Sequence, residues 1–394
     1  MGKFKNNNNT VPNGWQQKRI DEVSILTMGA SPSSASYNEE KIGLPLIQGN
    51  ADCRNRKTFP RIYTREITKE CKVGDIIMTV RAPAGAISKS VHNACIGRGV
   101  CAIEPKINSE FLYQVLVHHE NSWSRLSQGS TFEAISGSDI KSFTILVPTN
   151  KEQEKIAEIL STWDLAIEKQ EQLIGKKKEF KKGLMQRLLT GEVRFKEFKD
   201  EWNNKTLGHY IVPVSRECSK PNEGYWRLGL RSHAKGTFHE FVEDPSTVSM
   251  DKLYRVKCND LIVNITFAWE HAIAVADNMD EDKLVSHRFP TYEFKGDAYP
   301  QFFKYYILQP RFRHMLVNIS PGGAGRNRVM NKKDFLNINV RVPSYKEQVR
   351  IAEVLTVADK EIELLEKELE ALKLQKKGLM QRLLTGEVRV NISE

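Results

Sequence analysis

Apolar residues recur at alternating intervals of four and three positions over two stretches of about forty residues, one in the middle of the chain and one near its end. That spacing is typical of a helix that buries a narrow stripe against a partner helix. Each stretch follows a Val-Pro dipeptide, with Thr149 or Ser344 placed to cap the helix and an acidic residue three positions further on. Each ends at a Thr-Gly dipeptide, where Gly191 or Gly386 can adopt the left-handed conformation that terminates a helix. Forty residues would form a rod of about 58 Å.

The narrow stripe predicts that the two helices pack against each other as an antiparallel coiled coil. The charged residues between the apolar positions leave too little apolar surface for either helix to be buried on all sides. The alternative is two independent core helices, one per domain. A pairing of Ile156 with Leu383 would place the stem of Lys376 against the ring of Trp163, with the ammonium group reaching solvent. The residues expected to pair are Ile156, Leu160, Trp163, Ile167, Ile174, Leu184, Leu188, Ile351, Leu355, Ile362, Leu365, Leu369, Leu372, Leu379 and Leu383.

The helices belong to an internal repeat. The segment KKGLMQRLLTGEVR occurs at residues 181–194 and again, unchanged, at residues 376–389, an offset of 195 residues. Each helix follows a segment that opens with a tryptophan, Trp15 or Trp202, and contains a turn before a strand, KVGDIIMTV or KCNDLIVNI. Short β-rich stretches between Gly, Pro and Asn turns predict α+β domains rather than a doubly wound sheet.

We therefore expect an α+β fold with a pseudo-twofold internal repeat, in which two globular domains are separated by two long antiparallel helices. The expected boundaries are residues 1–147 for the first globular domain, 148–198 for the first helical spacer, 199–342 for the second globular domain and 343–394 for the second helical spacer.

Composition adds a class of partner and a compartment. The chain of 394 residues has a formal net charge of +10, which favours a polyanionic partner because Lys and Arg displace phosphate counterions. The N-terminus lacks the apolar region of a signal peptide, and no apolar run is long enough to span a membrane. Its six cysteines show neither a zinc-type spacing nor a disulfide framework, so free thiols in the cytoplasm are expected.

Motifs of catalysis are absent from the sequence. It contains neither the Asn/Asp-Pro-Pro-aromatic signature of an N6-adenine methyltransferase nor the P-loop pattern G-x-x-x-x-G-K-[ST]. His118 and His119 near Glu120 could suggest a metal, but adjacent residues point to opposite faces of an element. We therefore expect neither a metal nor a catalytic residue in this chain.

The arrangement of these motifs resembles the specificity subunits of type I restriction-modification systems. Two features carry the resemblance: the order of domain and helix, twice over, and the ending KKGLMQRLLTGEVR. The segments PLIQGNADCRN, GDIIMTVRAPAG and QGSTFEAISGSDIKSFTILVP are also similar to parts of that family's target-recognition domains. The second domain departs from this pattern, because it has Asn259-Asp260 in place of Gly74-Asp75 and lacks the GSTF sequence.

The resemblance implies a non-catalytic subunit that reads a split, asymmetric sequence of double-stranded DNA, one half per domain. It also implies paired helices that set the gap between the half-sites and dock two methyltransferase subunits, with two restriction-translocation subunits in the full complex. S-adenosylmethionine, ATP and Mg would then be bound only by those partners.

Polar residues at matched points of the two domains are the candidates for DNA contact. Base edges are read by Arg, Asn, Gln, Ser and Thr, and phosphates are held by Lys and Arg. Trp269 is expected to fill a core rather than to stack on a base. The candidates are Gln48, Asn50, Asp52, Arg54, Arg56, Thr79, Arg81, Ser130 and Thr131 in the first domain, and Arg227, Arg231, Ser232, His233, Asn264, Thr266, Arg326, Asn327 and Arg328 in the second.

Two other functions are compatible with parts of this pattern. A stand-alone DNA-binding regulator or architectural protein would need no enzyme partners, but identical readers in a dimer predict a palindromic site. A coiled-coil scaffold would leave the basic loops unexplained. Two dissimilar domains in one chain instead predict an asymmetric, bipartite site.

Overall fold

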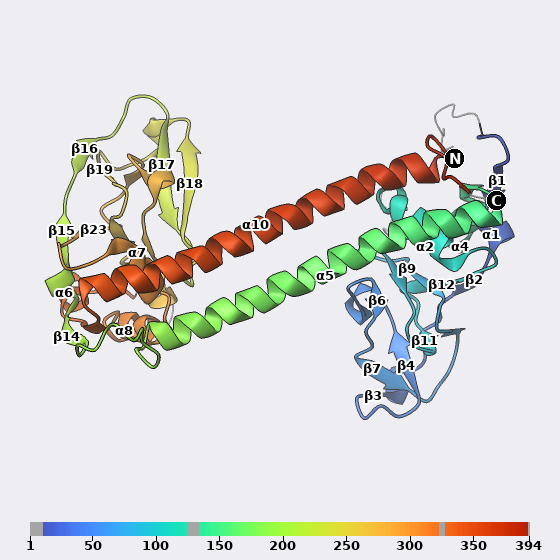
Figure 1. The fold of residues 1–394 in the computed structure, drawn as a ribbon, viewed down its shortest axis with the longest axis horizontal. Coiled ribbons are helices and arrows are strands. Elements are labelled where there is room, and N and C mark those ends of the chain that lie inside the picture. Colours follow the sequence, from blue (N-terminus) through green and yellow to red (C-terminus); the bar gives the residue numbers. More distant parts are fainter. Residues whose placement is uncertain (1–10, 124–133, 323–327, 393–394) are drawn as a thin grey trace. The chain divides into compact units, whose positions relative to one another are not determined.

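The computed structural model describes residues 11–123, 134–322 and 328–392. The chain forms two compact units, Met1–Gln172 together with Lys367–Glu394, and Leu173–Glu366 (Figure 1). Each unit contains one globular domain and a part of both long helices. These units therefore differ from the segments expected from the sequence, because the helix ends fold together with the domains.

The first domain contains two mixed β-sheets and short helices. Strand β9 is central, since Ile76 and Met78 face one apolar core and Ile77 faces another. Burial on both faces explains the uninterrupted apolar run in this strand. The six-stranded sheet has the order β2 (Ser24–Met28), β12 (Val100–Pro105), β9 (Ile76–Thr79), β10 (Ile87–Lys89), β6 (Lys57–Thr58) and β5 (Cys53–Arg54). The five-stranded sheet has the order β3 (Tyr37–Asn38), β7 (Ile62–Thr64), β4 (Leu44–Ile47), β11 (Ala94–Ile96) and β8 (Glu70–Cys71). The helices are α1 (Ile20–Val23), α2 (Ser109–His118) and α4 (Gly137–Ser142).

The second domain repeats this plan with different details. Its strand β20 is again covered on both faces, with Leu261 and Val263 in one core and Ile262 in another. The four-stranded sheet has the order β15 (Ile211–Val214), β23 (Thr291–Phe294), β20 (Leu261–Val263) and β21 (Ile273–Val275). The five-stranded sheet has the order β16 (Glu217–Ser219), β19 (Lys252–Arg255), β22 (Leu284–Val285), β17 (Tyr225–Leu230) and β18 (Thr237–Val242). The helices are α6 (Leu207–Tyr210), α7 (Pro300–Tyr306), α8 (Pro310–Asn318) and α9 (Lys332–Leu336).

A two-stranded antiparallel ladder closes each domain at its base. Strand β1 (Gln16–Arg19) pairs with β13 (Thr144–Val147), and β14 (Asn203–Thr206) pairs with β24 (Asn339–Val342). The first and last strands of each domain thus lie side by side. The last strand ends at the valine of the Val-Pro dipeptide that leads into the long helix. The chain thus enters and leaves each domain at neighbouring points of this ladder.

The long helices are α5 (Asn150–Leu188) and α10 (Tyr345–Leu384), and they begin and end where the sequence predicts. Gly191 and Gly386 follow them with φ of 75° and 73°, the left-handed conformation expected at a helix terminus. All fifteen residues expected to pair are buried or half-buried. Several apolar residues outside the predicted stripe are exposed, namely Leu165, Leu173, Phe180, Val357, Leu364 and Leu374, whereas Met380 and Leu384 are buried although the stripe did not include them.

Within each unit, ion pairs join α5 to α10. A further ion pair in each unit joins an arginine that follows one long helix to a glutamate in the first turn of the other. They occur in matched sets related by the 195-residue offset, as the pseudo-twofold repeat requires. The matched pairs are Asp164–Lys376 and Asp359–Lys181, Glu171–Lys373 and Glu366–Lys178, and Glu152–Arg389 and Glu347–Arg194.

Residues at the ends of the apolar stripe also belong to the cores of the globular domains. Ile156, Leu160 and Leu383 belong to the core of the first domain, and Leu188, Ile351 and Leu355 belong to the core of the second. The expectation that Lys376 reaches solvent is wrong, because only 10% of its side chain is exposed and its ammonium group bonds Asp164 at 2.6 Å. A buried ammonium group needs such a carboxylate partner. The α+β fold with two repeated domains and two long helices is confirmed.

Candidate nucleic-acid interface

Equivalent turns lead into the central strand of both domains. Asp75 and Asp260 are buried, and each carboxylate accepts the backbone N–H of the residue three positions earlier, at 2.7 and 2.8 Å. The preceding Gly74 and Asn259 have φ of 96° and 69°. Asn tolerates this left-handed conformation better than most side chains, so the substitution of Gly by Asn preserves the turn. The two domains therefore enter their central strand through the same type of turn despite this difference in sequence.

The first candidate loop, residues 48–56, is shaped by its own polar side chains. Asp52 is buried, where its carboxylate accepts the backbone N–H of Gln48 at 2.8 Å and the Nε of Arg61 at 3.0 Å. The amide of Gln48 donates to the hydroxyl of Tyr37 at 2.7 Å. Asp52 thus holds the loop in shape rather than presenting an acceptor to a ligand. Asn50 is exposed beside it.

Arg56 lies in this loop but is tied to another segment. Its guanidinium donates to both carboxylate oxygens of Glu120, at 2.6 and 2.9 Å, and to the backbone oxygen of Ile87. The hydrogen bonds to Glu120 are the main cause that raises the pKa of Arg56. These contacts border a cavity of about 510 Å³ that is also lined by Asn50 and Gly85. The cavity brings the loop at residues 48–56 next to the loop that follows β9.

The two candidates at the end of β9 differ in exposure. Thr79 is buried, and its hydroxyl donates to the backbone oxygen of Pro83 and accepts the backbone N–H of Ala86. Thr79 therefore shapes the loop after the strand. Arg81 is exposed in that loop and available for a ligand.

In the second domain, the loop after β17 meets the turn after β20. The hydroxyl of Ser232 donates to the carboxylate of Glu270 at 2.5 Å, and the backbone N–H of His233 donates to the Glu270 backbone oxygen at 2.8 Å. Arg231 is exposed in the same loop, where its guanidinium donates to the backbone oxygen of Thr237. Residues 231–233 and the turn at 264–271 therefore form one surface.

The turn after β20 contains the remaining described candidates of this surface. Asn264 is buried and accepts the backbone N–H of Thr266 at 3.0 Å, so it fixes the turn as Thr79 does in the first domain. Trp269 is half-buried rather than in the core, contrary to expectation. Its indole N–H donates to the backbone oxygen of Thr266 at 3.1 Å, and Arg328 lies over its ring. The indole therefore keeps a face at the surface.

Arg227 lies outside this surface, on strand β17, where its guanidinium bonds Glu240 of the neighbouring strand at 2.6 Å. The candidates Ser130, Thr131, Arg326 and Asn327 fall outside the described residues. The chain after Ser130 and Thr131 is described from residue 134, and there the backbone N–H of Ile135 donates to the backbone oxygen of Val80. The chain after Arg326 and Asn327 is described from residue 328, and there the backbone N–H of Met330 donates to the backbone oxygen of Ile265. Both segments therefore rejoin their domain at the end of the central strand.

Exposed aromatic residues at these loops were missed in the sequence analysis. Phe59 and Phe238 follow the two hairpin turns and have 53% and 37% of their surface exposed. Trp226 and Phe241 form an exposed pair on β17 and β18, with ring centroids 5.2 Å apart. The signal that could have found them is an aromatic residue within a few positions of Arg or Lys in a predicted hairpin.

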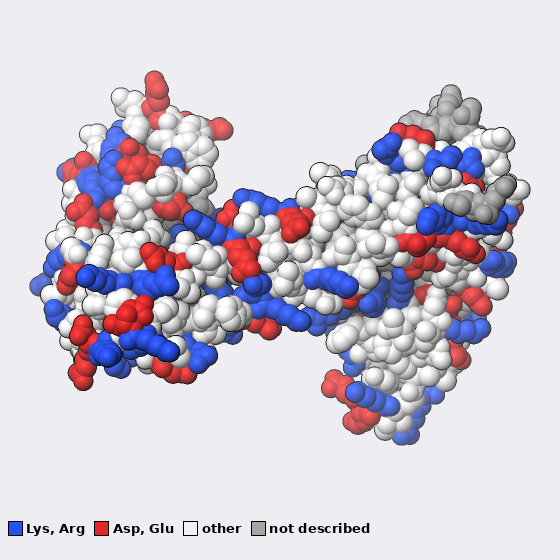
Figure 2. All heavy atoms as spheres, viewed as in Figure 1, with Lys and Arg blue, Asp and Glu red and all other residues white. Residues whose placement is uncertain are grey.

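Charge alone does not single out the interface. Figure 2 shows Lys and Arg side chains interspersed with Asp and Glu over the domains and the long helices on the face in view. The net charge of +10 is therefore not gathered into one patch on this face. Ion pairs distinguish the cations that have a carboxylate partner from those that have none.

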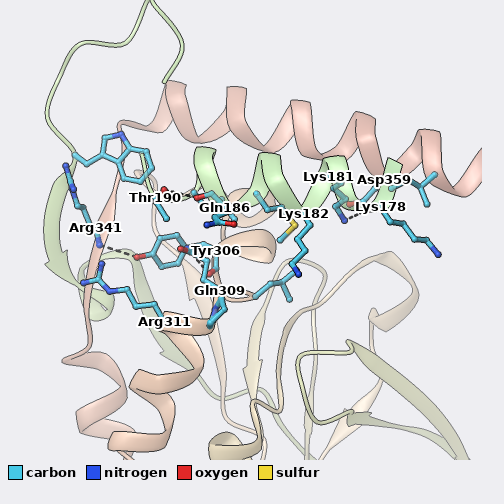
Figure 3. Close-up of a pocket in the computed structure, with 16 residues that line it drawn as sticks. Lys178, Lys181, Lys182, Gln186, Thr190, Tyr306, Gln309, Arg311, Arg341 and Asp359 are labelled. Atoms are coloured by element: carbon cyan, nitrogen blue, oxygen red, sulfur yellow. Dashed lines mark hydrogen bonds and ion pairs between the residues drawn. The ribbon is translucent and has the colours of Figure 1, made fainter. Parts of the chain in front are cut away.

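A groove of about 810 Å³ lies beside α5 in the second unit (Figure 3). Apolar side chains, among them Met185 and Leu189, line much of it, and Lys178, Lys181, Lys182, Arg311 and Arg341 contribute cations. The one carboxylate in its lining, Asp359, bonds Lys181 and the hydroxyl of Tyr305. Among the described residues, Lys182, Arg311 and Arg341 have no carboxylate partner. The groove is apolar within and positive at its edge.

The described residues contain no group of three or more His, Cys, Asp and Glu side chains placed to hold a metal ion. In the part of the chain that the structure describes, no helix is both long and apolar enough to cross a membrane. All six cysteines are free.

Known proteins are similar to this chain in sequence and in fold. The MjaX type I restriction enzyme specificity subunit of Methanocaldococcus jannaschii is 33% identical over 191 residues, which are 47% of this chain and 45% of that protein. The chain thus matches less than half the length of that relative. The MjaVIII specificity subunit of the same organism is 25% identical over 409 residues, which cover 96% of this chain and 94% of that protein. The crystal structure of the type I restriction-modification S subunit from M. genitalium covers 99% of both chains with a TM-score of 0.57 at 17% identity, a likeness of fold.

The family model for the type I restriction modification DNA specificity domain matches residues 12–174 and 215–374. The first match contains one globular domain and most of α5, whereas the second begins just after β15 and contains the rest of the second domain and most of α10. The family's unit therefore occurs twice, as the internal repeat does. This chain therefore belongs to the type I restriction modification DNA specificity domain family.

Proposed function

We propose that this chain is the DNA sequence-specificity subunit of a type I restriction-modification complex and that each domain reads one half of an asymmetric, bipartite site. The observation that carries the proposal is that one repeated frame of helices bears dissimilar loops in its two copies. Three ion pairs in the helices and just beyond their ends recur at one offset, whereas the loops at the ends of β9 and β20 carry different polar residues. Two different surfaces on one repeated frame suit two different half-sites.

In this proposal the chain itself performs no chemistry. Methyl transfer and cleavage belong to partner subunits, two of each kind, which bind S-adenosylmethionine, ATP and Mg. The names of the relatives support such an assembly, because they describe subunits of restriction enzymes. The complex acts on double-stranded DNA in the cytoplasm.

The groove beside α5 is the proposed docking place for one methyltransferase subunit. Its apolar lining requires a covering of apolar side chains, and its unpaired cations favour carboxylates around them. An acidic segment with an apolar face fits both requirements. Duplex DNA would satisfy the cations but leave the apolar lining uncovered.

A domain exchange tests the half-site assignment. Residues 16–147 are replaced by the corresponding segment of a relative, with both junctions in the β1–β13 ladder, and the variant is produced with its partner subunits. Sequencing of methylated DNA should show one half-site changed and the other half-site and the gap retained. The reciprocal exchange of residues 203–342 is the control and should change the opposite half. A change in both halves, or in neither, contradicts the proposal.

A further inference from the structure

Three arginines of the candidate loops lie over aromatic rings. Arg54 lies over Phe59 with its guanidinium carbon 5.8 Å from the ring centroid, and Arg231 lies over Phe238 at 5.3 Å. Arg328 lies over the ring of Trp269 at 5.4 Å. These distances are within the range in which a cation is attracted to the face of an aromatic ring. Both domains thus contain the same pairing at a candidate reading loop.

These three arginines differ from their neighbours in lacking a carboxylate. Arg56 lies two residues from Arg54 and pairs with Glu120, whereas Arg227 lies on the same hairpin as Arg231 and pairs with Glu240. Among the residues that the structure describes, Arg54, Arg231 and Arg328 have no ion-pair partner. Their positive charge is therefore available for a ligand.

Backbone geometry presents two of the arginines in similar ways. In the β5–β6 hairpin, Asn55 and Arg56 have φ of 49° and 57°, and Arg54 directly precedes them. In the loop between β17 and β18, His233 and Ala234 have φ of 62° and 49°. In the two-residue turn between β5 and β6, these φ values reverse the chain tightly. The loop between β17 and β18 is longer, and the backbone N–H of Arg231 donates to the backbone oxygen of Gly236 across it at 3.0 Å. In both cases a phenylalanine, Phe59 or Phe238, returns beside the arginine. Arg231 is fixed further by the bond from its guanidinium to the backbone oxygen of Thr237.

A guanidinium held over an aromatic ring is suited to reading a base. The contact with the ring restrains the side chain and leaves N–H donors free, so less side-chain entropy is lost when a ligand binds. Guanine presents two acceptors, O6 and N7, in the major groove, and the planar fork of Arg matches them with two hydrogen bonds. A carboxylate such as Glu120 would occupy the same donors.

We propose that Arg54 reads a guanine of the first half-site, that Arg231 and Arg328 read guanines of the second, and that Phe59, Phe238 and Trp269 are their positioning residues. This inference rests on the proposed function, because it concerns the same DNA site. It assigns the base class and separates the arginines that read from those that shape the loops.

The test uses the complete complex and conservative variants. Arg54→Lys and Arg231→Lys keep the charge but lose the planar fork, and Phe59→Leu and Phe238→Leu remove the ring. Arg65→Lys and Arg255→Lys are matched controls, since both residues are exposed in the same domains and lie outside the candidate loops. Readouts are the methylated motif in sequenced DNA and binding to duplexes in which each base pair of the site is replaced in turn.

Arg231→Lys should relax one guanine of the second half-site, with discrimination there reduced about 5- to 150-fold and affinity for unrelated DNA unchanged. Arg54→Lys should do the same in the first half-site only. Each Leu variant should relax the same position as its arginine, by a smaller factor, because the fork remains but is no longer held. The controls should retain the full motif.

Two results overturn the inference alone: a wild-type half-site without a G·C pair, or arginine variants that weaken all sequences equally or change no position. A wild-type complex that methylates no bipartite site would instead overturn the proposed function and this inference with it.

Discussion

Glu152, in the first repeat, shows how one side chain can bind the end of the second repeat. It lies in the first turn of α5, and 2% of its side chain is exposed. Its carboxylate accepts Arg389 at 2.6 Å, the indole N–H of Trp15 at 3.4 Å and the hydroxyl of Thr149 at 3.1 Å. Burial alone would raise the pKa of Glu152, but the hydrogen bonds, that of Arg389 first, lower it below its usual value.

The Arg389→Ala variant should be destabilised, because it leaves this carboxylate buried without its cation. The expected loss is about 1.5–3 kcal/mol in the free energy of unfolding at pH 7. Since the pKa of Glu152 is lower in the folded protein, the stabilisation is present above pH 4.5 and disappears as the pH falls through the folded value. Urea unfolding at several pH values measures this. The difference between wild type and variant should shrink toward acid pH, and a difference independent of pH would contradict the assignment.

Helix α5 both packs against α10 and lines the groove of the second unit. One face carries the apolar stripe and the ion pairs with α10, and its C-terminal half also borders the groove. Lys181 bonds Asp359 and is therefore committed to the helix pair, whereas the adjacent Lys182 is exposed without a carboxylate partner among the described residues. The same lysine-rich run thus contains a structural cation and an available one.

Charge reversal of the available cations should weaken docking of a methyltransferase subunit. Lys182→Glu with Arg311→Glu places negative charge where an acidic segment is expected, so calorimetry with the isolated partner should show affinity reduced at least about tenfold. Lys360→Glu, an exposed change on α10 outside the groove, is the control and should bind as the wild type does. Unchanged partner affinity, or loss of DNA binding alone, would show that the groove holds something else.

At the scale of the whole molecule, α5 and α10 each run through both compact units, since the unit boundaries at residues 172 and 366 fall inside them. Repeated ion pairs hold the two helices in register within each unit. Under the proposed function, we expect the length of these helices to fix the gap between the two half-sites.

Inserting four residues after Gly175 and four after Leu364 lengthens both helices by about one turn, or 6 Å. The apolar stripe remains nearly in phase because four residues are close to one turn. The unread gap should grow by one or two base pairs, given the rise of about 3.4 Å per pair, while both half-sites stay unchanged. Sequencing of methylated DNA gives the gap directly. An active complex with the original gap would show that the helices do not set it.

The sequence by itself determined the frame. The start and end of α5 and α10, the buried stripe and the repeat could be predicted because helical periodicity and capping are local properties of the chain. The family could also be identified, since the order of domain and helix, twice over, and the helix ending KKGLMQRLLTGEVR carry the resemblance.

Only the tertiary structure decided what each polar residue does. Asp52, Thr79 and Asn264 were candidates for DNA contact, yet they are buried and bond the backbone of their own loops. Glu120 lies 64 residues from Arg56, the guanidinium it binds, and no local pattern encodes that pairing. Periodicity shows which face of an element is buried, but whether an arginine meets a carboxylate or an aromatic ring depends on segments that folding alone brings together.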